Sequence, residues 1–376
     1  MEKDRKRIGI LFNFSPSWMG GVVYVMNIIK AFHHLDSEDK PVIFIFYNPN
    51  LERFVEEIDY PFLNRIPRQY PPVYKTFLQS FVKGRNMFVH DLIQAYALDA
   101  VFPLHDYPVK SKLDAKIVSW YADLQHKYYP EFFTRIKRIE RDLRIRLILR
   151  NAKDLVVSSQ AVKDDFYTFF KVPKTCKVHV YHFVSIIDKF PSNDFEPIRK
   201  QYNLPEEYFM ISNQFHKHKN HKVAFQAIAD LQKRGVKKNL VLTGKLPEDD
   251  GSDYVAELKK ILTDNELGNR IFFLGVLPRD VQLAIMKNAT AIVQPSLFEG
   301  WSTVIEDAKS LQVPVIASDL KVNREQLGPT GTYFEPHNAI QLAQLIEMAL
   351  KSEGDLYEDY KIRVKKAAYE LFAVFN

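Results

Sequence analysis

Short apolar runs alternate with amphipathic segments along the first half of the chain. The first run is followed by a turn, SPSWMGG, and then by apolar residues at helical spacing, which predicts a strand, a glycine loop and a helix. The apolar runs that predict strands are Arg7–Phe14, Pro41–Asn48, Asp99–His105, Ala115–Leu124, Asp154–Ser159 and Lys177–Ser185. Short apolar strands that alternate with helices indicate a parallel sheet covered on both faces.

This alternation stops once and then restarts. Residues Ile186–Leu204 contain two prolines and charges of both signs, so we place a domain boundary there. Beyond it, the segments that predict strands are YFMISNQF, NLVLTG, RIFFLG, TAIVQPS, PVIAS and GTYFEP. We therefore predict an N-terminal domain over residues 1–190, a C-terminal domain over 191–354 and a terminal helix over 355–376. The pattern identifies no partner for that helix, and packing on the N-terminal domain is one option.

The predicted fold is two Rossmann-like, doubly wound α/β domains in tandem. We expect them to face each other across a cleft, because open α/β sheets bind ligands at the carboxyl ends of their strands. The length agrees with two domains, since 376 residues exceed what one hydrophobic core usually organises. Fold alone names no reaction.

Composition limits the classes of function. Hydrophobic residues make up 46% of the chain and charged residues 26%, as in ordinary globular proteins. Cys176 is the only cysteine, which excludes an internal disulfide and favours a reducing, cytoplasmic compartment. The apolar runs are too short for a signal peptide or a membrane-spanning helix. The net charge of +6 admits anionic partners, but it is spread along the chain without a nucleic-acid recognition motif, so we expect no nucleic acid.

The segment from Pro295 to Asp307 is the most informative candidate site. A strand ends at Pro295, a loop with Glu299 follows, and a helix is predicted to begin near Ser302. Backbone N–H groups at a helix start suit a diphosphate. The residues that would supply them are Ser302, Thr303 and Val304.

Two neighbouring carboxylates follow in the predicted helix. Asp307 has the chemistry to accept hydrogen bonds from vicinal ribose hydroxyls, and Glu306 is an equally good acceptor. The alternative is that these polar residues only cap the helix and complement its dipole.

A second candidate site lies where the strand ending near Asn213 leads into the next helix. The loop between them holds Lys217 and Lys219 with three histidines. A fixed cation such as Lys219 neutralises a diphosphate leaving group without a metal. The alternative is a solvated basic loop. We predict no metal, because no carboxylate or cysteine accompanies the histidines at ligand spacing.

Gly20 and Gly21 stand between the first strand and its helix. Their missing side chains would let the backbone approach a phosphate or a sugar closely, although a tight turn is the simpler explanation. The chain lacks the G-x-G-x-x-G fingerprint and the phosphate loop of ATP-binding proteins, which removes support for NAD and ATP.

His126 follows the fourth predicted strand, beside Asp123 and Lys127. It is a candidate for contact with a donor or acceptor hydroxyl, or for proton exchange near neutral pH. A satisfied structural histidine is the alternative. His105 and Asp106, at the end of the preceding strand, form a weaker candidate of the same kind.

Residues Arg135–Arg150 predict a strongly basic helix, RIKRIERDLRIRLILR. Basic helices with an apolar face can rest on anionic lipid. The interpretation we favour is a solvated basic face over the core.

In their order, these segments resemble the retaining glycosyltransferases of family 4, which have the two-domain GT-B architecture. In that family a loop and helix begin with Glu-Gly, carry a second glutamate eight residues later and lead into a Pro-Val-Ile strand. Glu299-Gly300 and Pro314-Val315-Ile316 match this pattern. The eighth residue after Glu299 is Asp307 instead of glutamate, whereas Glu306 is the seventh. The ribose position is therefore open between these two residues.

The resemblance also assigns roles at the other segments. The family's phosphate-binding lysine corresponds to Lys219, but the position of its arginine holds Gln214, and Lys217 or His216 would have to compensate. His126 lies where the family often has an active-site histidine. Gly20 and Gly21 correspond to the family's donor-side glycine loop. Glu299 would hold the donor sugar.

The function implied by the resemblance is transfer of a sugar, with retention, from a nucleotide-sugar to a hydroxyl acceptor. No cofactor or metal is expected, and the acceptor would be a glycan or a lipid-linked glycan. The amino-acid sequence of these segments resembles that of a bacterial subgroup that builds cell-surface polysaccharides. Peripheral contact with an anionic membrane is a further expectation. The alternatives are a nucleotide-sugar epimerase, a sugar phosphorylase, and a non-catalytic glycan- or membrane-associated binding protein.

Overall fold

The computed structural model describes residues 5–16, 18–70, 73–104, 115–192, 194–245, 253–352 and 354–376. His105 and Asp106 lie outside these residues. The chain divides into two compact units: the N-terminal unit, Met1–Ile186 with Lys361–Asn376, and the C-terminal unit, Ile187–Tyr360. No helix in the described ranges is long and apolar enough to cross a membrane.

Seven of the described strands form one parallel sheet in the N-terminal unit, in the order β3-β2-β1-β4-β5-β6-β7. These strands are β1 Arg7–Phe12, β2 Val42–Tyr47, β3 Leu63–Pro67, β4 Ala100–Leu104, β5 Lys116–Tyr121, β6 Asp154–Val157 and β7 Lys177–Val180. The helices of this unit are α1 Met19–Phe32, α2 Glu52–Glu56, α3 Val73–Lys83, α4 His90–Tyr96, α5 Gln125–Tyr128, α6 Arg135–Asn151, α7 Gln160–Phe169 and α15 Tyr360–Val374, with short 3-10 turns η1 Pro49–Leu51 and η2 Pro130–Phe132.

The predicted strands of this unit are observed with shorter ends, but β3 was not predicted. Its sequence, LNRIP, lacks an apolar run, and it forms the sheet edge beside β2, where its side chains are exposed or half-buried. An edge strand needs no apolar face on both sides, so hydrophobic pattern alone does not reveal it.

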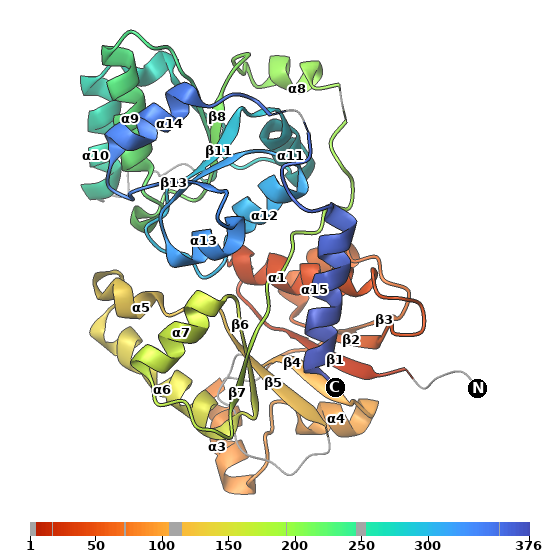
Figure 1. Cartoon of the computed structure of the whole chain (residues 1–376). Helices are drawn as coiled ribbons and strands as arrows, with labels where there is room; N and C mark the ends of the chain where they lie inside the picture. Colours follow the sequence, from red (N-terminus) through yellow and green to blue (C-terminus); the bar gives the residue numbers. More distant parts are fainter. Residues whose placement is uncertain are drawn as a thin grey trace. The chain divides into compact units, whose positions relative to one another are not determined.

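Neighbouring residues of β4 show the two layers that cover this sheet. Val101 packs in a cluster with Leu92 and Ile93 of α4. The next residue, Phe102, points to the other face and contacts Phe375, which in turn contacts Phe32 of α1. The terminal helix α15 therefore packs on the N-terminal unit, where it runs beside α1 (Figure 1).

The C-terminal unit has a parallel sheet of six described strands in the order β10-β9-β8-β11-β12-β13. They are β8 Phe209–Ser212, β9 Leu240–Thr243, β10 Ile271–Phe273, β11 Ala291–Gln294, β12 Val315–Ser318 and β13 Thr332–Phe334. The helices are α8 Glu196–Gln201, α9 His221–Lys233, α10 Asp253–Asp264, α11 Arg279–Asn288, α12 Thr303–Ser310, α13 Lys321–Leu327 and α14 Ala339–Met348, with 3-10 turns η3 Lys217–Lys219 and η4 Leu267–Asn269. All six predicted strands are present.

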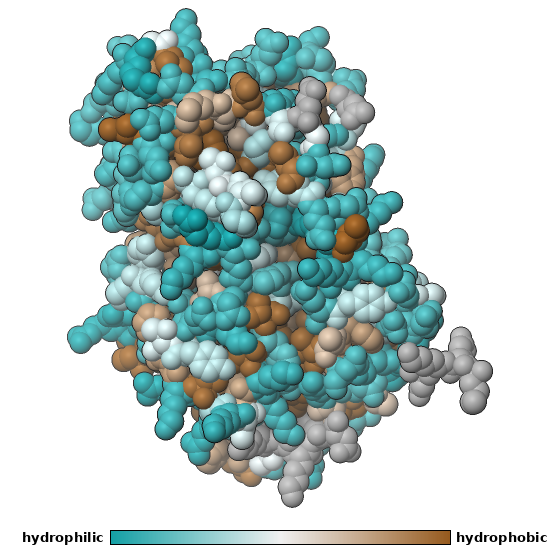
Figure 2. All heavy atoms as spheres, in the orientation of Figure 1, coloured by the Kyte–Doolittle hydropathy of each residue, from teal (hydrophilic) through white to brown (hydrophobic). Residues whose placement is uncertain are grey.

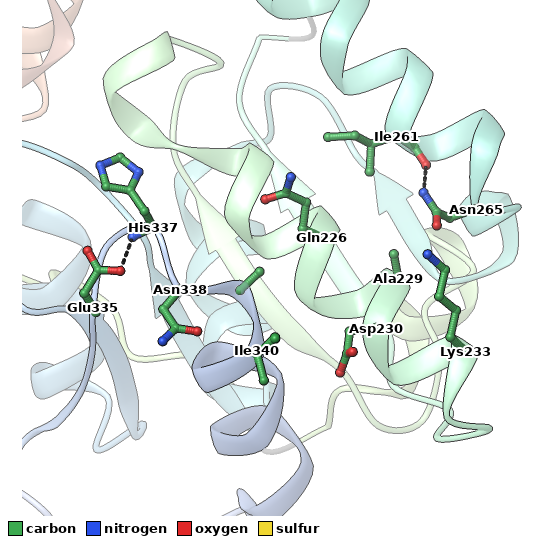
Figure 3. Close-up of a pocket in the computed structure, with 11 residues that line it drawn as sticks. Gln226, Ala229, Asp230, Lys233, Ile261, Asn265, Glu335, His337, Asn338 and Ile340 are labelled. Atoms are coloured by element: carbon green, nitrogen blue, oxygen red, sulfur yellow. Dashed lines mark hydrogen bonds between the residues drawn. The ribbon is translucent and has the colours of Figure 1, made fainter.

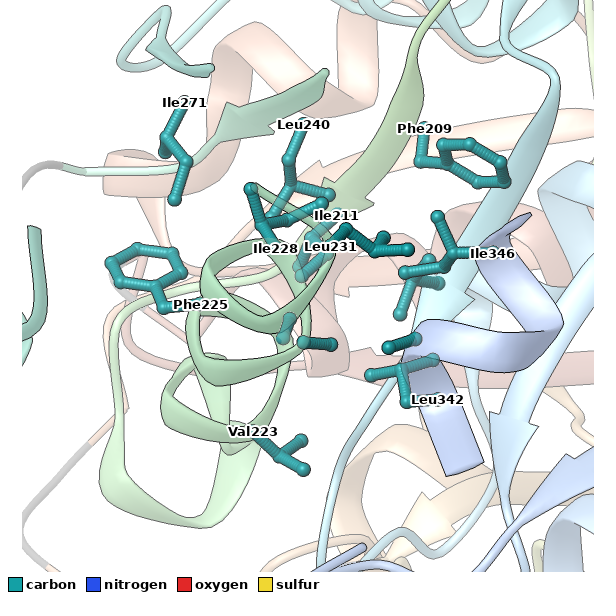
Figure 4. Packing of buried hydrophobic residues seen from close by; sticks show 14 of the residues in the cluster. Phe209, Ile211, Val223, Phe225, Ile228, Leu231, Leu240, Ile271, Leu342 and Ile346 are labelled. Carbon is teal, nitrogen blue, oxygen red and sulfur yellow. The ribbon is translucent and has the colours of Figure 1, made fainter. Parts of the chain in front are cut away.

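Alternate residues of β8 divide the core of this unit into two layers. Phe209 and Ile211 pack with α9 and α14, whose apolar side chains meet the strands in Figure 4. Met210 faces the opposite layer, together with Ile305 of α12 and Ile285 of α11. Because both faces are covered, the polar residues of the segments singled out above gather at the carboxyl ends of the strands.

Candidate functional site

A buried polar network lies at the carboxyl end of β11. Glu299 accepts hydrogen bonds through Oε1 from Lys219 Nζ at 2.6 Å and from Gln294 Nε2 at 2.8 Å. Gln294 is the last residue of β11, and its Oε1 accepts from Asn213 Nδ2 at 3.0 Å. The Glu299 side chain is only 10% exposed, so its charge is held by these two donors. The two segments that the sequence marked separately therefore meet at Lys219 and Glu299.

The short turn η3 places Lys219 at this point. Asn220, which follows the turn, has a positive φ of 54° and donates through Nδ2 to the carbonyl oxygens of Pro295 and Pro336 at 3.1 and 2.8 Å. Leu297 N donates to the carbonyl oxygen of His218 at 2.7 Å. These bonds fix the basic loop against the loop that follows β11, which excludes the interpretation of a freely solvated loop for Lys219.

The helix α12 begins at Thr303, as predicted, with Ser302 as its N-cap. Ser302 Oγ accepts from Ile305 N at 3.3 Å, which satisfies one N–H of the first turn. Gln326, from α13, accepts from Ser302 N at 3.2 Å and donates to Ser302 O at 2.8 Å. The Ser302 N–H is thus already used, a contact that the sequence did not reveal.

Two further N–H groups at this helix start have no acceptor among the described residues. They belong to Thr303 and Val304. Both donors lie at the positive end of α12, where an anionic oxygen is stabilised. Of the three backbone N–H groups predicted to bind an anion, two therefore remain available, those of Thr303 and Val304.

The two carboxylates of α12 have different partners. Glu306 accepts from Gln326 Nε2 at 2.9 Å and lies 3.4 Å from Lys309 Nζ, so it ties α12 to α13. Asp307 forms a two-pronged ion pair with the guanidinium of Arg279, at the start of α11. The Asp307 side chain is 3% exposed, whereas that of Arg279 is 46% exposed.

Sequence reasoning missed Arg279, Gln294, Asn220 and Gln326. The available signal was position, because Arg279 and Gln294 directly follow or end strands whose carboxyl ends form one edge of the sheet. The amides gave no signal of their own, since Asn and Gln occur at many strand ends without a functional role.

Gln214 and Lys217 lie beside the network without joining it. Gln214 Oε1 accepts from Lys245 N at 3.1 Å, after the turn at Gly244. Gly244 has a φ of +127°, and a Cβ there would lie 2.6 Å from Asn213 O, so only glycine allows this close approach of β9 to β8. Lys217 is exposed. The predicted compensation for the missing arginine is thus untested by these contacts.

The three histidines of the basic loop are held away from protonation. Burial lowers the pKa of His218 to about 4, aided by the charge of Lys219 and opposed by Glu299. Burial and Lys219 also lower the pKa of His221 to about 3, and of His216 to a smaller extent. His221 stacks on Phe215 with ring centroids 4.4 Å apart. The lowered pKa values keep all three histidines neutral at pH 7, although only His221 is buried in the core, His218 being half-buried and His216 exposed.

We expect the stability of the protein to fall between pH 6.5 and pH 4 in part through His218. In that interval the unfolded chain binds a proton at this histidine and the folded chain does not, so the free energy of unfolding decreases as the pH falls. The variant His218→Gln should lose about 2 kcal/mol of the difference in unfolding free energy between pH 7 and pH 4.5. Urea unfolding at the two pH values measures this.

The exposed His337 provides the control, because His337→Gln should leave the pH dependence unchanged. An equal pH dependence in His218→Gln and the wild type would contradict the assignment.

The glycines of the N-terminal unit are placed differently from the prediction. Gly20 and Gly21 lie in the first turn of α1 and not in a loop before it. A Cβ on Gly21 would lie 2.6 Å from the indole of Trp18, which stacks on Trp120 with ring centroids 5.6 Å apart. Gly21 thus makes room for an aromatic stack of the protein itself, and a Gly21→Ala substitution would displace Trp18.

His126 is buried, with 2% of the residue exposed. Its Nε2 lies 2.9 Å from Asp142 Oδ1 on α6, and Lys127 Nζ donates to the other oxygen of Asp142 at 2.7 Å. Burial lowers the pKa of His126, against the raising effect of Asp142. Its contacts are those of a structural histidine, and a catalytic role stays a prediction.

The helix α6 carries the solvated basic face that we favoured only in part, with Arg135, Lys137, Arg146 and Arg150 exposed. Arg138, Arg141 and Arg144 are half-buried, whereas Ile136 and Ile139 point outward and are 80% and 68% exposed. The C-terminal half packs normally, with its apolar residues in the core. In the N-terminal half, Arg138 and Arg141 are half-buried where apolar side chains would be expected, and the isoleucines are exposed where polar side chains would be expected.

An open pocket on the C-terminal unit lies apart from this network. It is bounded by Gln226 and Lys233 on α9, Asn265 after α10, and His337 and Ile340 near α14 (Figure 3). None of its lining residues belongs to the Lys219–Glu299 network or to α12. In the described ranges, no group of three His, Cys, Asp or Glu side chains is placed to hold a metal ion.

Comparison with known proteins finds a family that resembles part of the chain. Residues 194–368 match the family described as glycosyl transferases group 1. The O-antigen chain mannosyltransferase RfbU of Salmonella typhimurium is 26% identical over 215 residues, which cover 57% of this chain and 55% of that protein. The putative glycosyltransferase EpsF of Bacillus subtilis is 33% identical over 105 residues, 28% of this chain and 25% of that protein. The chain thus spans about half, or less, of the length of these curated relatives.

Solved structures agree on the fold over the whole chain. The structure of Alr3699/HepE from Anabaena in complex with UDP and glucose aligns with a TM-score of 0.67, at 18% identity, over 97% of this chain and 99% of that one. The sucrose-phosphate synthase from Thermosynechococcus elongatus aligns with a TM-score of 0.65, at 18% identity, over 99% and 96%. The two Rossmann-like domains have the fold of GT-B proteins, and residues 194–368 are similar to the glycosyl transferases group 1.

Proposed function

We propose that this protein transfers a sugar from a nucleoside diphosphate donor to a hydroxyl acceptor, with retention of anomeric configuration. The observation that carries the proposal is the Lys219–Glu299 pair beside the start of α12, at the carboxyl ends of the sheet in the region matched to glycosyl transferases. The family match gives no support to the epimerase alternative. Its relatives named for O-antigen synthesis support surface polysaccharide as the product class.

Transfer of a sugar from a nucleoside diphosphate requires two kinds of contact. As the bond between the anomeric carbon and the β-phosphate oxygen breaks, negative charge grows on the diphosphate. Lys219 Nζ and the N–H groups of Thr303 and Val304 supply a cation and two fixed dipoles for that charge. Glu299, held by Lys219 and Gln294, is available to orient hydroxyls of the donor sugar.

For the ribose we propose Asp307. Glu306 accepts from Gln326 of α13 and contacts Lys309, so it already ties two helices together. Asp307 pairs with Arg279, whose side chain is 46% exposed, and its two carboxylate oxygens have the chemistry to accept from vicinal hydroxyls. Asp307 also lies about one turn from the helix start, which suits a nucleoside that extends away from the diphosphate.

Release of nucleoside diphosphate from UDP-, GDP- and dTDP-sugars tests the proposal directly. We expect one donor class to be consumed, slowly with water alone and faster with a polyprenyl-linked or glycan acceptor. Nuclear magnetic resonance of the product should show the donor's anomeric configuration, and chelation with EDTA should leave the rate unchanged. Binding of a nucleotide-sugar without any turnover would instead favour the non-catalytic alternative, and accumulation of an epimer would favour the epimerase.

We further propose that the N-terminal unit rests on an anionic membrane, with its bulk in the cytoplasm. Two helices on the same face of its sheet expose apolar side chains between cations (α3 and α6 in Figure 1). The face that Figure 2 shows has brown apolar surface interspersed with teal over this unit. The exposed apolar side chains are Tyr74, Leu78, Phe81 and Val82 on α3 and Ile136, Ile139 and Leu143 on α6. Exposed apolar residues beside lysines and arginines suit a surface of acidic lipid.

We expect the double variant Phe81→Ser/Ile139→Ser to bind vesicles containing phosphatidylglycerol about tenfold more weakly than the wild type. Both side chains are largely exposed, so their loss removes apolar area from the membrane contact without opening the core. Cosedimentation with vesicles measures this. Leu350→Ser, at an exposed leucine of the C-terminal unit, is the matched control and should bind normally. Equal binding of both variants would remove this face from the membrane contact.

A further inference from the structure

The inward face of α6 changes its chemistry halfway along the helix. In the C-terminal half, Ile145, Ile148 and Leu149 face the sheet and are buried. One turn and two turns before Ile145, at the same angle around the helix, stand Arg141 and Arg138. Both are half-buried, so these two guanidinium groups occupy positions where the rest of the helix uses isoleucine and leucine. Burial of cations without partners is costly, so this placement calls for a counter-charge.

The neighbouring carboxylates supply only part of that counter-charge. Asp142 is taken by His126 and Lys127. Glu140 is taken by Lys137 and Arg144. Arg141 has only Asp123, at 3.8 Å, which is beyond hydrogen-bond distance. For the Arg138 guanidinium, no ion pair or hydrogen bond is found among the described residues.

Aromatic rings orient Arg141 without neutralising it. Arg141 lies over the ring of Phe133 at 4.9 Å and over that of Tyr121 at 5.8 Å. The Nε atoms of Arg138 and Arg141 are buried without an acceptor. The side chain of Arg141 is nevertheless 25% exposed, so part of it remains open to solvent. Aromatic stacking of this kind orients the planar fork of an arginine.

The position of the pair coincides with the ligand edge of the N-terminal sheet. Tyr121 is the last residue of β5, and Asp123 and His126 follow it at the carboxyl end of the strand. Open parallel sheets bind their ligands outside this edge. The Lys219–Glu299 network belongs to the other unit, and no part of the arginine pair contributes to it.

From these observations we propose that Arg138 and Arg141 form an oxyanion site for a phosphate group of the acceptor substrate. This assignment rests on the proposed function, because it names the chemical class of its acceptor: a sugar or lipid esterified with phosphate. Two planar guanidinium forks suit a diphosphate, whose oxygens accept paired hydrogen bonds. The exposed apolar side chains on the outer face of the same helix would lie at the lipid end of such an acceptor.

The test measures binding of farnesyl diphosphate, with farnesol and inorganic diphosphate as partial probes. By isothermal titration, with the donor site of the C-terminal unit saturated by a nucleoside diphosphate, the wild type should bind farnesyl diphosphate and inorganic diphosphate but not farnesol. The double variant Arg138→Gln/Arg141→Gln should bind both phosphates about thirtyfold more weakly or worse, since it loses several charge-assisted hydrogen bonds. Arg135→Gln/Arg146→Gln removes the same charge from the exposed side of α6 and should bind normally.

Further measurements distinguish a lipid headgroup from an acceptor phosphate as the ligand. They also distinguish failure of this proposal from failure of the proposed function. Binding to phosphatidylglycerol vesicles should weaken to a similar, small extent in both double variants, because each loses two cations from the same helix. If the inward variant lost vesicle binding but kept farnesyl diphosphate, the arginines would serve the lipid headgroup and the acceptor site would be wrong. Nucleoside diphosphate should bind equally well to the wild type and to the inward variant, Arg138→Gln/Arg141→Gln. If it bound to neither, the proposed function would be contradicted, independently of the result for this site. A Lys pair, Arg138→Lys/Arg141→Lys, retains the charge if the Gln pair fails to fold, and it should recover binding only in part. Full affinity in the Lys pair would contradict recognition by the guanidinium forks.

Discussion

Lys219→Ala should lower the turnover of donor sugar by a hundredfold or more, while the protein stays folded. Lys219 supplies the only side-chain cation that the described residues bring to Glu299, and removal of one preorganised group that stabilises transition-state charge costs about 10²- to 10³-fold in rate. The loss should be largest in kcat if Lys219 acts on the departing diphosphate, since the charge grows as the bond breaks. Steady-state kinetics with the best nucleotide-sugar measure it.

The control for this variant lies two residues earlier. Lys217 is exposed and belongs to the same short turn, so Lys217→Ala removes an equal charge without touching Glu299. We expect its rate to stay within about threefold of the wild type, as for a screened surface charge. Lys219→Gln, which can still donate to Glu299, separates loss of the cation from collapse of the network. Unchanged donor affinity and rate in Lys219→Ala would remove this residue from the site.

Asp307→Asn should abolish the preference for a ribose over a 2′,3′-dideoxyribose. In the wild type, hydrogen bonds from the two hydroxyls to a carboxylate should make a nucleoside diphosphate bind about ten- to a hundredfold more tightly than its dideoxy analogue. In Asp307→Asn the two ligands should bind almost equally. Because the ratio is taken within one variant, any change that the freed Arg279 makes to the diphosphate affinity cancels. Calorimetric titration of both ligands measures the ratio.

Glu306→Gln is the matched variant and should keep the preference. Its hydrogen bond with Gln326 and its contact with Lys309 tie α12 to α13, so the expected loss is in stability, about 1 to 2 kcal/mol. If the preference disappeared in Glu306→Gln and survived in Asp307→Asn, the two carboxylates would exchange roles.

The sequence predicted the strands that carry the site because those strands are buried on both faces. Apolar runs such as FMIS and AIVQ end in polar residues, and that change marks the carboxyl edge of the sheet. The start of α12 was equally readable, because Ser302 is a residue type with a strong N-cap preference. Local chemistry therefore located both halves of the Lys219–Glu299 pair.

The partners of these residues were not readable, because they come from distant parts of the chain. Gln326 lies 24 residues beyond Ser302, and Arg279 lies 28 residues before Asp307. Neither belongs to a motif, and only the packing of α12 between α11 and α13 brings them near. The same holds for α6, whose basic residues are evident in the sequence, whereas packing decides which of them turn inward. We predicted a loop at Gly20 and Gly21 because a glycine pair usually indicates a turn. In the structure the pair lies in the first turn of a helix, where Gly21 makes room for an indole.

Thermal unfolding of the wild type in the presence of UDP, GDP and dTDP is the most direct test of nucleotide binding by the C-terminal unit. A ligand at a hundred times its Kd stabilises the folded state by about 2.7 kcal/mol, which raises the Tm by about 5 °C or more. We predict such a shift for at least one of the three nucleotides, and a much smaller shift for that nucleotide in Lys219→Ala. If none of the three raised the Tm of the wild type, the assignment of this network to a nucleoside diphosphate would be contradicted.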